Sequence, residues 1–295
     1  MRTTRPQHRP PQDMYCPMLQ VSDGCTHGAC KFCDIYTGIP FHPSPMNEIL
    51  EDIDEIARTA TALTRRIYLT GGNPFALPNA RLVEIFDAVE ERIPTVVSYG
   101  GFCRITDIAR KTDAELAELA ARGVNDLAIG GESGHDEVLA FMNKAQTASD
   151  LVEQGKRLNA AGIDFTLFYL AGLAGAGRGQ ENAITSARAF SAAQPRTILI
   201  VTLTPTKTWP LKRDIEEGRW TPASEVETAR EIRTFIANLD CSAHIVCSHD
   251  SDVIRFDGLL PGDQEKMLQL MDARIPKINE QAARLMREMI HKTTF

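Results

Sequence analysis

The sequence lacks the features that would place the protein in a membrane or on nucleic acid. No run of apolar residues reaches the ~18 residues that a membrane-spanning helix requires. The formal net charge is −7 and the isoelectric point lies near 5.6, whereas a nucleic-acid-binding surface is normally basic. Residues 1–9 are basic, but no apolar stretch follows them, so we expect no secretory signal. We therefore expect a cytoplasmic protein without membrane or nucleic-acid partners.

A disulfide framework is also missing. The chain has seven cysteines, an odd number, and they are not spread in pairs along the sequence. Such usage is typical of a reducing compartment. A length of 295 residues and a hydrophobic content of 43% are sufficient for one large domain, or for a domain with a small appendage. The thiols are therefore expected to be reduced.

Three of these cysteines lie in one short loop. Cys25, Cys30 and Cys33 fall within nine residues and are separated by four and then two positions. Loops this short strain a disulfide between any two of them, whereas three thiolates can converge on a soft metal centre. On a [4Fe–4S] cluster, three cysteines leave one iron without a protein ligand. A structural zinc site completed by His27 is the alternative that the spacing leaves open.

Strand and helix patterns alternate over most of the chain. Six strand–helix units of this kind predict a parallel α/β sheet curled into a partial (β/α)6 barrel of the TIM type. We expect an extended N-terminal arm at residues 1–13, the barrel at 14–220 and a mostly helical C-terminal extension packed on it at 221–295. The expected strands are residues 15–22, 66–70, 95–99, 126–130, 165–170 and 197–203, with helices that include 79–92, 149–161 and 181–193.

The C-terminal extension has weaker patterns. A helix is expected to begin at Thr221-Pro222, and another is expected over residues 273–291. Between them, residues 243–247 suggest an edge strand and residues 248–262 a loop. Functional residues of such a barrel are expected at the C-terminal ends of the strands. Small and polar residues gather at these ends, in the segments 71–73, 98–104, 131–133, 172–177 and 202–205.

The run from Gly24 to Cys33 resembles the cluster loop of the radical S-adenosylmethionine (SAM) superfamily. In that family an aromatic residue precedes the last cysteine, and Phe32 stands at this place. The usual spacing is three and then two residues, so one extra residue separates Cys25 from Cys30. A subset that includes coproporphyrinogen III oxidase-like members has this longer spacing. The resemblance covers roughly residues 14–260 and implies a [4Fe–4S] cluster on the three cysteines, with SAM as the second cofactor.

The same resemblance implies which residues contact SAM. Its amino group binds at a turn that is often Gly-Gly-Glu in the family and is Gly71-Gly72-Asn73 here, with Asn73 in place of the glutamate. Backbone carbonyls of this turn are therefore expected to carry most of the contact.

Further SAM contacts are implied at three later strand ends. Glu132 and Ser133 would hold the ribose, and Lys144 would pair with the carboxylate. The segment 168–177 would form an apolar seat for adenine, beside Thr202. A phosphate-binding loop in that segment is a weak alternative, because its lysine and Ser/Thr are missing.

The reaction implied by the resemblance starts with one electron passing from the cluster to SAM. The sulfonium C–S bond breaks, giving methionine and a 5′-deoxyadenosyl radical that abstracts hydrogen from a small-molecule substrate. An electron donor such as flavodoxin or ferredoxin would reduce the cluster. The protein would orient the cofactors and exclude water and oxygen.

Two residues are candidates for catalysis. Cys103, just after the third expected strand, could return a hydrogen atom to a substrate radical, although a small buried filler is the simpler interpretation. His249 is a candidate on the substrate side. Two other functions stay open: a zinc-stabilised binding module without redox chemistry, and a radical SAM enzyme that modifies tetrapyrroles. The sequence shows no cluster of arginines suited to several propionates, which disfavours the latter.

Overall fold

The computed structural model describes residues 9–204 and 209–294. The chain forms two compact units, and each is described by itself. The first unit comprises Met1–Gly28, Ile35–Ile129 and Arg157–Phe165, and the second comprises Ala29–Asp34, Gly130–Lys156 and Thr166–Phe295. Cys25 therefore belongs to the first unit, whereas Cys30 and Cys33 belong to the second. In the described part of the chain, no helix is long and apolar enough to cross a bilayer.

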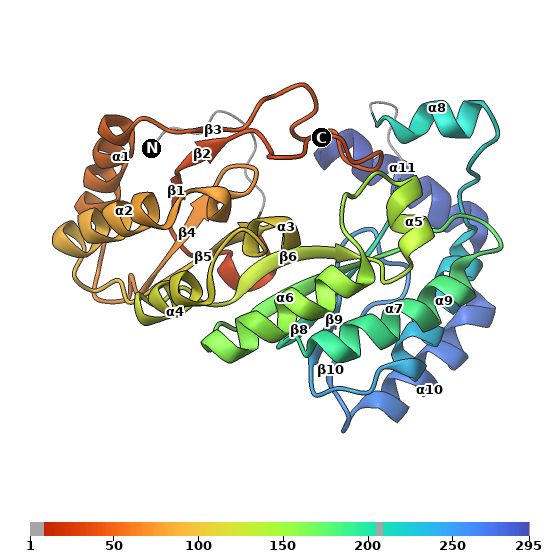
Figure 1. Ribbon diagram of the computed structural model, residues 1–295. Coiled ribbons are helices and arrows are strands. Elements are labelled where there is room, and N and C mark those ends of the chain that lie inside the picture. Colours follow the sequence, from red (N-terminus) through yellow and green to blue (C-terminus); the bar gives the residue numbers. More distant parts are fainter. Residues whose placement is uncertain (1–8, 205–208, 295) are drawn as a thin grey trace. The chain divides into compact units, whose positions relative to one another are not determined.

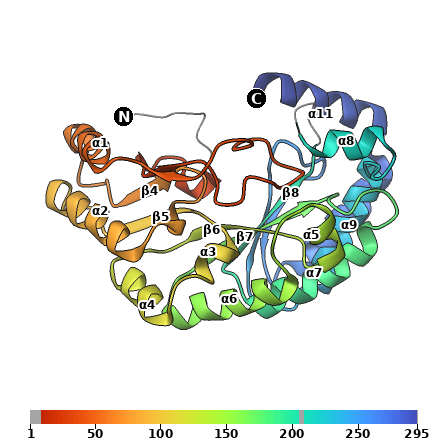
Figure 2. The same cartoon turned by 45° about the horizontal axis from the view of Figure 1, so that its top comes forward.

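The first unit is built on parallel strands that alternate with helices (Figures 1 and 2). The strands pair in the order β1-β4-β5-β6, and all three pairs are parallel. A separate antiparallel pair, β2 with β3, follows β1. The elements are η1 (Pro11–Asp13), β1 (Met18–Gln20), β2 (Ser22–Asp23), β3 (His42–Pro43), α1 (Met46–Thr59), β4 (Arg66–Thr70), η2 (Pro74–Ala76), α2 (Asn79–Arg92), β5 (Ser98–Cys103), α3 (Ile105–Ile108), α4 (Asp113–Ala121) and β6 (Leu127–Glu132).

Local sequence explains why these elements form. Helix α1 begins directly after Pro45, the N-cap residue, whose carbonyl accepts the backbone N–H groups of Glu48 and Ile49. Ile49, Ile53 and Ile56 recur at helical spacing and are buried on one face of that helix. Helix α4 has a complete capping box, in which Thr112 accepts a hydrogen bond from the backbone N–H of Glu115.

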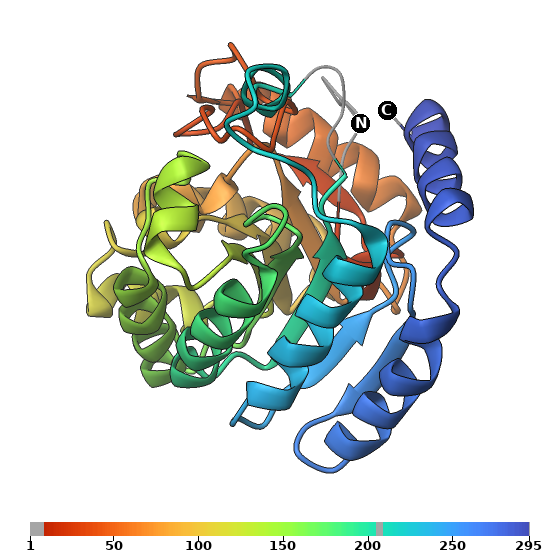
Figure 3. The ribbon, with the colours of Figure 1, turned by 90° about the vertical axis from the view of Figure 1, so that its right-hand side faces the viewer.

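The second unit continues the strand–helix alternation (Figure 3). Strands β7, β8 and β9 are parallel, and β10 pairs antiparallel with β9. Between β6 and β7 lie α5 and α6, and the chain passes from one unit to the other within β6, α6 and β7. The elements are α5 (Asp136–Phe141), α6 (Ala148–Ala161), β7 (Phe165–Ala171), α7 (Gly179–Ala193), β8 (Thr197–Thr202), α8 (Leu211–Glu216), α9 (Glu225–Asn238), β9 (His244–Cys247), β10 (Phe256–Leu259), α10 (Gln264–Arg274), η3 (Ile275–Lys277) and α11 (Glu280–Thr294).

Aromatic rings fill the core of the second unit between β7, α7 and α9. Tyr169 stacks on Phe235 with ring centroids 3.9 Å apart. Phe190 lies edge-on to both rings, at 5.8 Å from Tyr169 and 5.5 Å from Phe235. All three side chains are fully buried, so this cluster fixes the two helices against the strand.

Several predicted elements are confirmed, and others are wrong. Strand β4 and helix α2 begin and end where predicted, and α6, β7 and α7 differ by at most two residues. The first strand is shorter than predicted and is interrupted before β2. The third strand runs over residues 98–103 rather than 95–99, because it contains Gly100 and Gly101, which have low β propensity and hid it.

The C-terminal region departs most from expectation. Strand β9 is not an edge strand, since β10 forms within the predicted loop 248–262 and pairs with it. Helix α9 begins at Glu225, where Ser224 provides the cap, instead of at Thr221-Pro222. The single helix predicted over 273–291 is two helices, because Pro276 cannot continue α10. The described part of the predicted arm contains η1, and the domain limits at residues 13 and 220 stay a prediction.

Candidate active site

The thiols of the three-cysteine loop form no disulfide and are accessible in part. Cys25, Cys30 and Cys33 are half-buried, and none of the seven cysteines forms a disulfide. Cysteine sulfur is a soft donor of the kind that a [4Fe–4S] cluster takes, and three cysteines would leave one iron without a protein ligand. Among the described residues, no group of three or more His, Cys, Asp or Glu side chains is gathered as it would be around a metal ion.

The first half of this loop is held by the turn after strand β4. The backbone N–H of Thr26 donates to Asn73 Oδ1 at 3.0 Å, and Asn73 Nδ2 donates to Thr26 Oγ1 at 2.7 Å. Asn73 Nδ2 also donates to Asp107 Oδ2 at 2.6 Å. The Asn73 side chain has no exposed surface. Its amide is therefore committed to protein partners, one of which follows Cys25 directly.

Gly71 and Gly72 lie so close to the segment before Thr26 that neither position has room for a side chain. A Cβ atom on Gly72 would lie 1.9 Å from the carbonyl oxygen of Gly24, and one on Gly71 would lie 2.3 Å from Ser22 Oγ. Gly71 also has a φ of +121°, which side-chain-bearing residues rarely adopt. The glycine pair thus lets the turn lie against the backbone that leads into the cluster loop. Its predicted contact with SAM stays a prediction.

The second half of the loop packs into the second unit. Phe32 is 8% exposed and belongs to an apolar cluster that includes Leu173, Leu203 and Trp220. The backbone N–H of Lys31 donates to the Met142 carbonyl at 3.0 Å. These contacts fix the residue between Lys31 and Cys33, so Phe32 anchors the last thiol to the apolar interior.

Phe32, Glu132 and Lys144, three residues predicted to contact SAM, lie together in the second unit. Lys144 Nζ is 2.9 Å from Glu132 Oε1 and 5.8 Å from the centroid of the Phe32 ring. Lys144 is 6% exposed, although lysines are seldom buried. Glu132 ends strand β6 with a φ of +63°, a conformation that is uncommon for residues other than glycine. A buried ion pair on strained backbone, beside the cluster loop, is the geometry expected of a functional site.

Ser133 faces away from that group. Its hydroxyl donates to Asn182 Oδ1 at 2.6 Å and accepts the His135 N–H at 2.9 Å. The side chain has no exposed surface and lies against α7. Its hydrogen bonds account for a structural role, and its predicted contact with SAM ribose stays a prediction.

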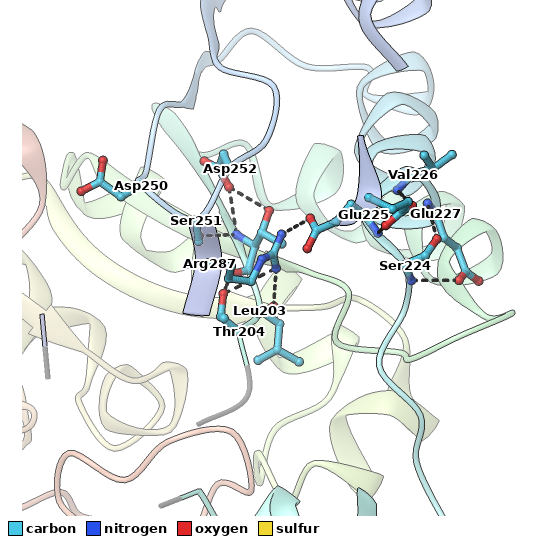
Figure 4. Close-up of polar contacts among 12 residues, drawn as sticks. Leu203, Thr204, Ser224, Glu225, Val226, Glu227, Asp250, Ser251, Asp252 and Arg287 are labelled. Atoms are coloured by element: carbon cyan, nitrogen blue, oxygen red, sulfur yellow. Dashed lines mark hydrogen bonds and ion pairs between the residues drawn. The ribbon is translucent and has the colours of Figure 1, made fainter. Parts of the chain in front are cut away.

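Thr202 and His249 both donate hydrogen bonds to the carboxylate of Asp252, which Figure 4 shows. The N–H and hydroxyl of Thr202 both donate to Asp252 Oδ1 at 2.9 Å, and the His249 N–H donates to Oδ2 at 3.0 Å. Burial raises the pKa of Asp252 to about 6, and these hydrogen bonds oppose the rise. The Ser251 N–H donates to His249 Nδ1 at 3.1 Å, so the neutral imidazole carries its hydrogen on Nε2.

Helix α11 reaches the end of strand β8, which the sequence did not indicate. Arg287 donates to the Leu203 carbonyl at 2.9 Å and pairs with the buried carboxylate of Glu225 (Figure 4). The strand-end segment 202–205 is described only to Thr204, because Pro205 lies outside the described residues.

A comparison with protein families identifies the chain. The family model described as "Radical SAM superfamily" matches residues 19–175, which is more than half of the 295 residues. The chain belongs to the radical SAM superfamily. The predicted family is therefore confirmed, and with it the predicted cofactors, a [4Fe–4S] cluster and SAM.

Solved structures of other proteins share the fold of this radical SAM superfamily member. Methylornithine synthase (PylB) is 21% identical, with a TM-score of 0.55 over 86% of this chain and 68% of that chain. Elp3 of the archaeon Methanocaldococcus infernus is 13% identical, with a TM-score of 0.54 over 88% and 63%. The radical SAM methyltransferase TsrM from Kitasatospora setae is 15% identical, with a TM-score of 0.55 over 69% and 39%. The predicted α/β partial-barrel class is confirmed.

These likenesses are limited to the fold. The chain spans about two fifths (39%) of the length of TsrM. No curated protein matches the chain.

The side chain of Cys103 is almost fully buried. It is 3% exposed, and its thiol donates to the Arg104 carbonyl at 3.4 Å. Burial, followed by the nearby Asp107 carboxylate, raises its pKa well above the usual range. The sulfur therefore keeps its hydrogen, which a hydrogen-atom donor requires, but its burial equally suits a packing residue. Its catalytic role stays a prediction.

The second unit also contains a hollow of about 320 Å³. Residues 173–176, from the predicted adenine seat, form one side, and Trp220 forms another. The guanidinium groups of Arg178 and Arg219 lie at its wall, paired with Glu137 and Asp214 respectively. This volume is within the range of small-molecule sites.

Proposed function

We propose that Cys25, Cys30 and Cys33 hold the [4Fe–4S] cluster and that the enzyme abstracts hydrogen from a small-molecule substrate. The observation that supports this most directly is the loop itself, which has three half-buried cysteines without disulfides and has Phe32 buried between the last two of them. When bound, the cluster and SAM supply one-electron chemistry that makes a carbon-centred radical. The chain supplies the ligands, the orientation and a site from which water is excluded.

Lys144 is the proposed partner of the SAM carboxylate. An ammonium group has three hydrogen-bond donors and can serve Glu132 and a second carboxylate together. The pair is nearly buried, with side-chain exposures of 7% and 13%, so a charge placed there is weakly screened. Glu132 in turn holds the lysine beside Phe32, which lies next to Cys33.

The adenine and substrate positions follow from the other strand ends. We propose that the apolar segment 173–176 seats adenine and that Thr202 contributes through the loop it holds. His249 is the proposed substrate contact, because Asp252 and Ser251 fix its backbone and its Nδ1 atom. Its Nε2–H group is then a donor for a polar substrate atom.

Reduction requires a partner protein, for which flavodoxin or ferredoxin is proposed. We propose a cytoplasmic location, because cysteines without disulfides and an oxygen-sensitive cluster suit a reducing compartment.

The Cys30→Ala variant tests the ligand assignment. We expect it to bind little iron and to leave SAM intact, while its thermal unfolding stays close to that of the wild type, because Cys30 is half-buried. Cys241→Ala is the matched control, since Cys241 is also a half-buried free thiol but lies outside the loop. Iron content and SAM cleavage are measured in both after anaerobic reconstitution. Cleavage of SAM by the Cys30 variant at the wild-type rate would show that the ligand assignment is wrong.

A further inference from the structure

The side-chain amide of Asn73 forms hydrogen bonds with other residues of the protein. It is fully buried, accepts the Thr26 N–H at 3.0 Å and donates to the Thr26 hydroxyl at 2.7 Å. Thr26 is the residue after Cys25, so these two bonds fix both the peptide group and the side chain that follow the first thiol. The amide cannot be turned over, because its NH₂ group would then face the Thr26 N–H.

Asp107 provides the fixed end of this network. It is 1% exposed and accepts hydrogen bonds from Asn73 Nδ2 at 2.6 Å, from Thr26 Oγ1 at 3.2 Å and from the Arg104 N–H at 3.1 Å. The last bond belongs to the capping box of α3. A buried carboxylate is tolerated only when donors satisfy it, and here the donors come from the turn, the cluster loop and the helix cap. Asp107 thus connects Thr26 to helix α3 through hydrogen bonds.

The backbone that precedes Cys25 packs closely against Gly72. A Cβ on Gly72 would lie 2.9 Å from the Cα of Cys25 and 1.9 Å from the Gly24 carbonyl oxygen. The peptide before Cys25 is therefore limited by close packing, and the peptide after it by the network of Asn73 and Asp107.

We propose that Asn73 and Asp107 are positioning residues for Cys25, acting through the amide and hydroxyl of Thr26, and that Asn73 is not a SAM ligand. The inference rests on the proposed function in one respect, because Cys25 must be a ligand of the cluster. The sequence pattern predicted that Asn73, the third residue of the Gly71-Gly72-Asn73 turn, contacts SAM. In the proposal its side chain instead acts as a brace, which here means that its hydrogen bonds hold Thr26 in place.

The test compares two pairs of variants of the full chain. Thr26→Val removes the hydroxyl and keeps the shape, whereas Thr26→Ser keeps the hydroxyl. Asn73→Ala removes the brace, whereas Asn79→Ala removes another buried asparagine of the same unit, which binds Lys111 and the Glu115 carbonyl instead. Asn79→Ala reports the cost of losing any buried amide.

Three readouts are recorded. The first is hydrogen exchange at the Thr26 amide, which we expect to be about tenfold faster in Asn73→Ala, since one buried hydrogen bond is lost. The second is the rate at which a chelator removes iron from the reconstituted protein, expected to be about tenfold faster in Asn73→Ala and Thr26→Val. The third is the reduction potential of the cluster, expected to shift in these two variants. Thr26→Ser and Asn79→Ala should match the wild type in all three.

The outcomes separate the proposals. Wild-type amide exchange and iron retention in Asn73→Ala, together with weakened SAM binding, would overturn the brace and make Asn73 a SAM ligand. Loss of iron retention in Asn79→Ala to the same degree would also overturn it, because the effect would then be general. If the wild type takes up no iron, the proposed function fails, and amide exchange alone decides whether the brace exists.

Discussion

Glu231 is a buried carboxylate of the second unit that joins three of its elements. It is 1% exposed and accepts hydrogen bonds from the Tyr169 hydroxyl at 2.7 Å, from Asn182 Nδ2 at 2.8 Å and from the Gly172 N–H at 3.0 Å. Burial raises its pKa from 4.5 to about 7, and the hydrogen bonds oppose that rise. The residue therefore links the end of β7 to helices α7 and α9 and is sensitive to pH.

The raised pKa of Glu231 predicts that stability falls as the pH rises. Between pH 4.5 and about 7 the folded chain retains a proton that the unfolded chain has released. Folding is thus favoured at the acid end of this window, and the contribution is lost as the pH passes through the folded pKa. The loss amounts to about 3 kcal/mol, at 1.36 kcal/mol for each pH unit.

Glu231→Gln tests this prediction, because glutamine does not titrate. Urea unfolding of the two proteins is compared at pH 5, 6, 7 and 8. The free energy of unfolding of the variant should gain on that of the wild type by about 3 kcal/mol from the first pH to the last. Parallel pH profiles would contradict the assignment.

At the residue scale, the sequence predicted the chemistry better than the orientations. The spacing of Cys25, Cys30 and Cys33 is a local pattern, so it could be read directly. The direction of the Asn73 amide could not, because it depends on Thr26, 47 positions earlier. The burial of Lys144 was missed for a similar reason, since its partner Glu132 belongs to a strand end and lysines are usually exposed.

Among the elements, α11 has an unexpected part in holding α9. Glu280 of α11 accepts the backbone N–H groups of Glu225 at 2.9 Å and Val226 at 2.8 Å. These are N–H groups of the first helical turn, which have no partner within a helix. A carboxylate there also interacts favourably with the helix dipole.

Removal of this cap should destabilise the second unit. Glu280→Ala is expected to lower the free energy of unfolding by about 1–2 kcal/mol, because a cap and a dipole interaction are both lost. Glu265→Ala is the control, since Glu265 also lies in a first helical turn but accepts a hydrogen bond from Gln269 of its own helix. Urea unfolding measures both. Equal losses in the two variants would show that the contact between the helices contributes nothing.

The elements that could be predicted are those with a clear local pattern. Helix α2 and strand β4 have continuous apolar periodicity, and their limits were predicted correctly. Strand β10 contains Asp257 and Gly258 and exists because β9 pairs with it, which no local pattern reveals. The break at Pro276 could have been predicted from proline alone, and the helix expected over 273–291 disregarded it.

At the scale of the whole molecule, charge and composition exclude some classes of protein, whereas the family match names one class. The net charge of −7 disfavoured nucleic-acid binding and the odd number of cysteines disfavoured a disulfide framework, but neither named a family. The cluster loop indicated the radical SAM superfamily, and the match over residues 19–175 confirms that family. The substrate could not be predicted, because it depends on side chains from several strand ends rather than on one motif.

The central claim is tested most directly by SAM cleavage. The purified chain is reconstituted anaerobically with iron and sulfide, reduced with dithionite and incubated with SAM, and 5′-deoxyadenosine is quantified. We predict about four iron atoms per chain, as a [4Fe–4S] cluster requires, and 5′-deoxyadenosine that forms only in the reduced protein. A colourless, zinc-loaded protein that leaves SAM intact would contradict the account.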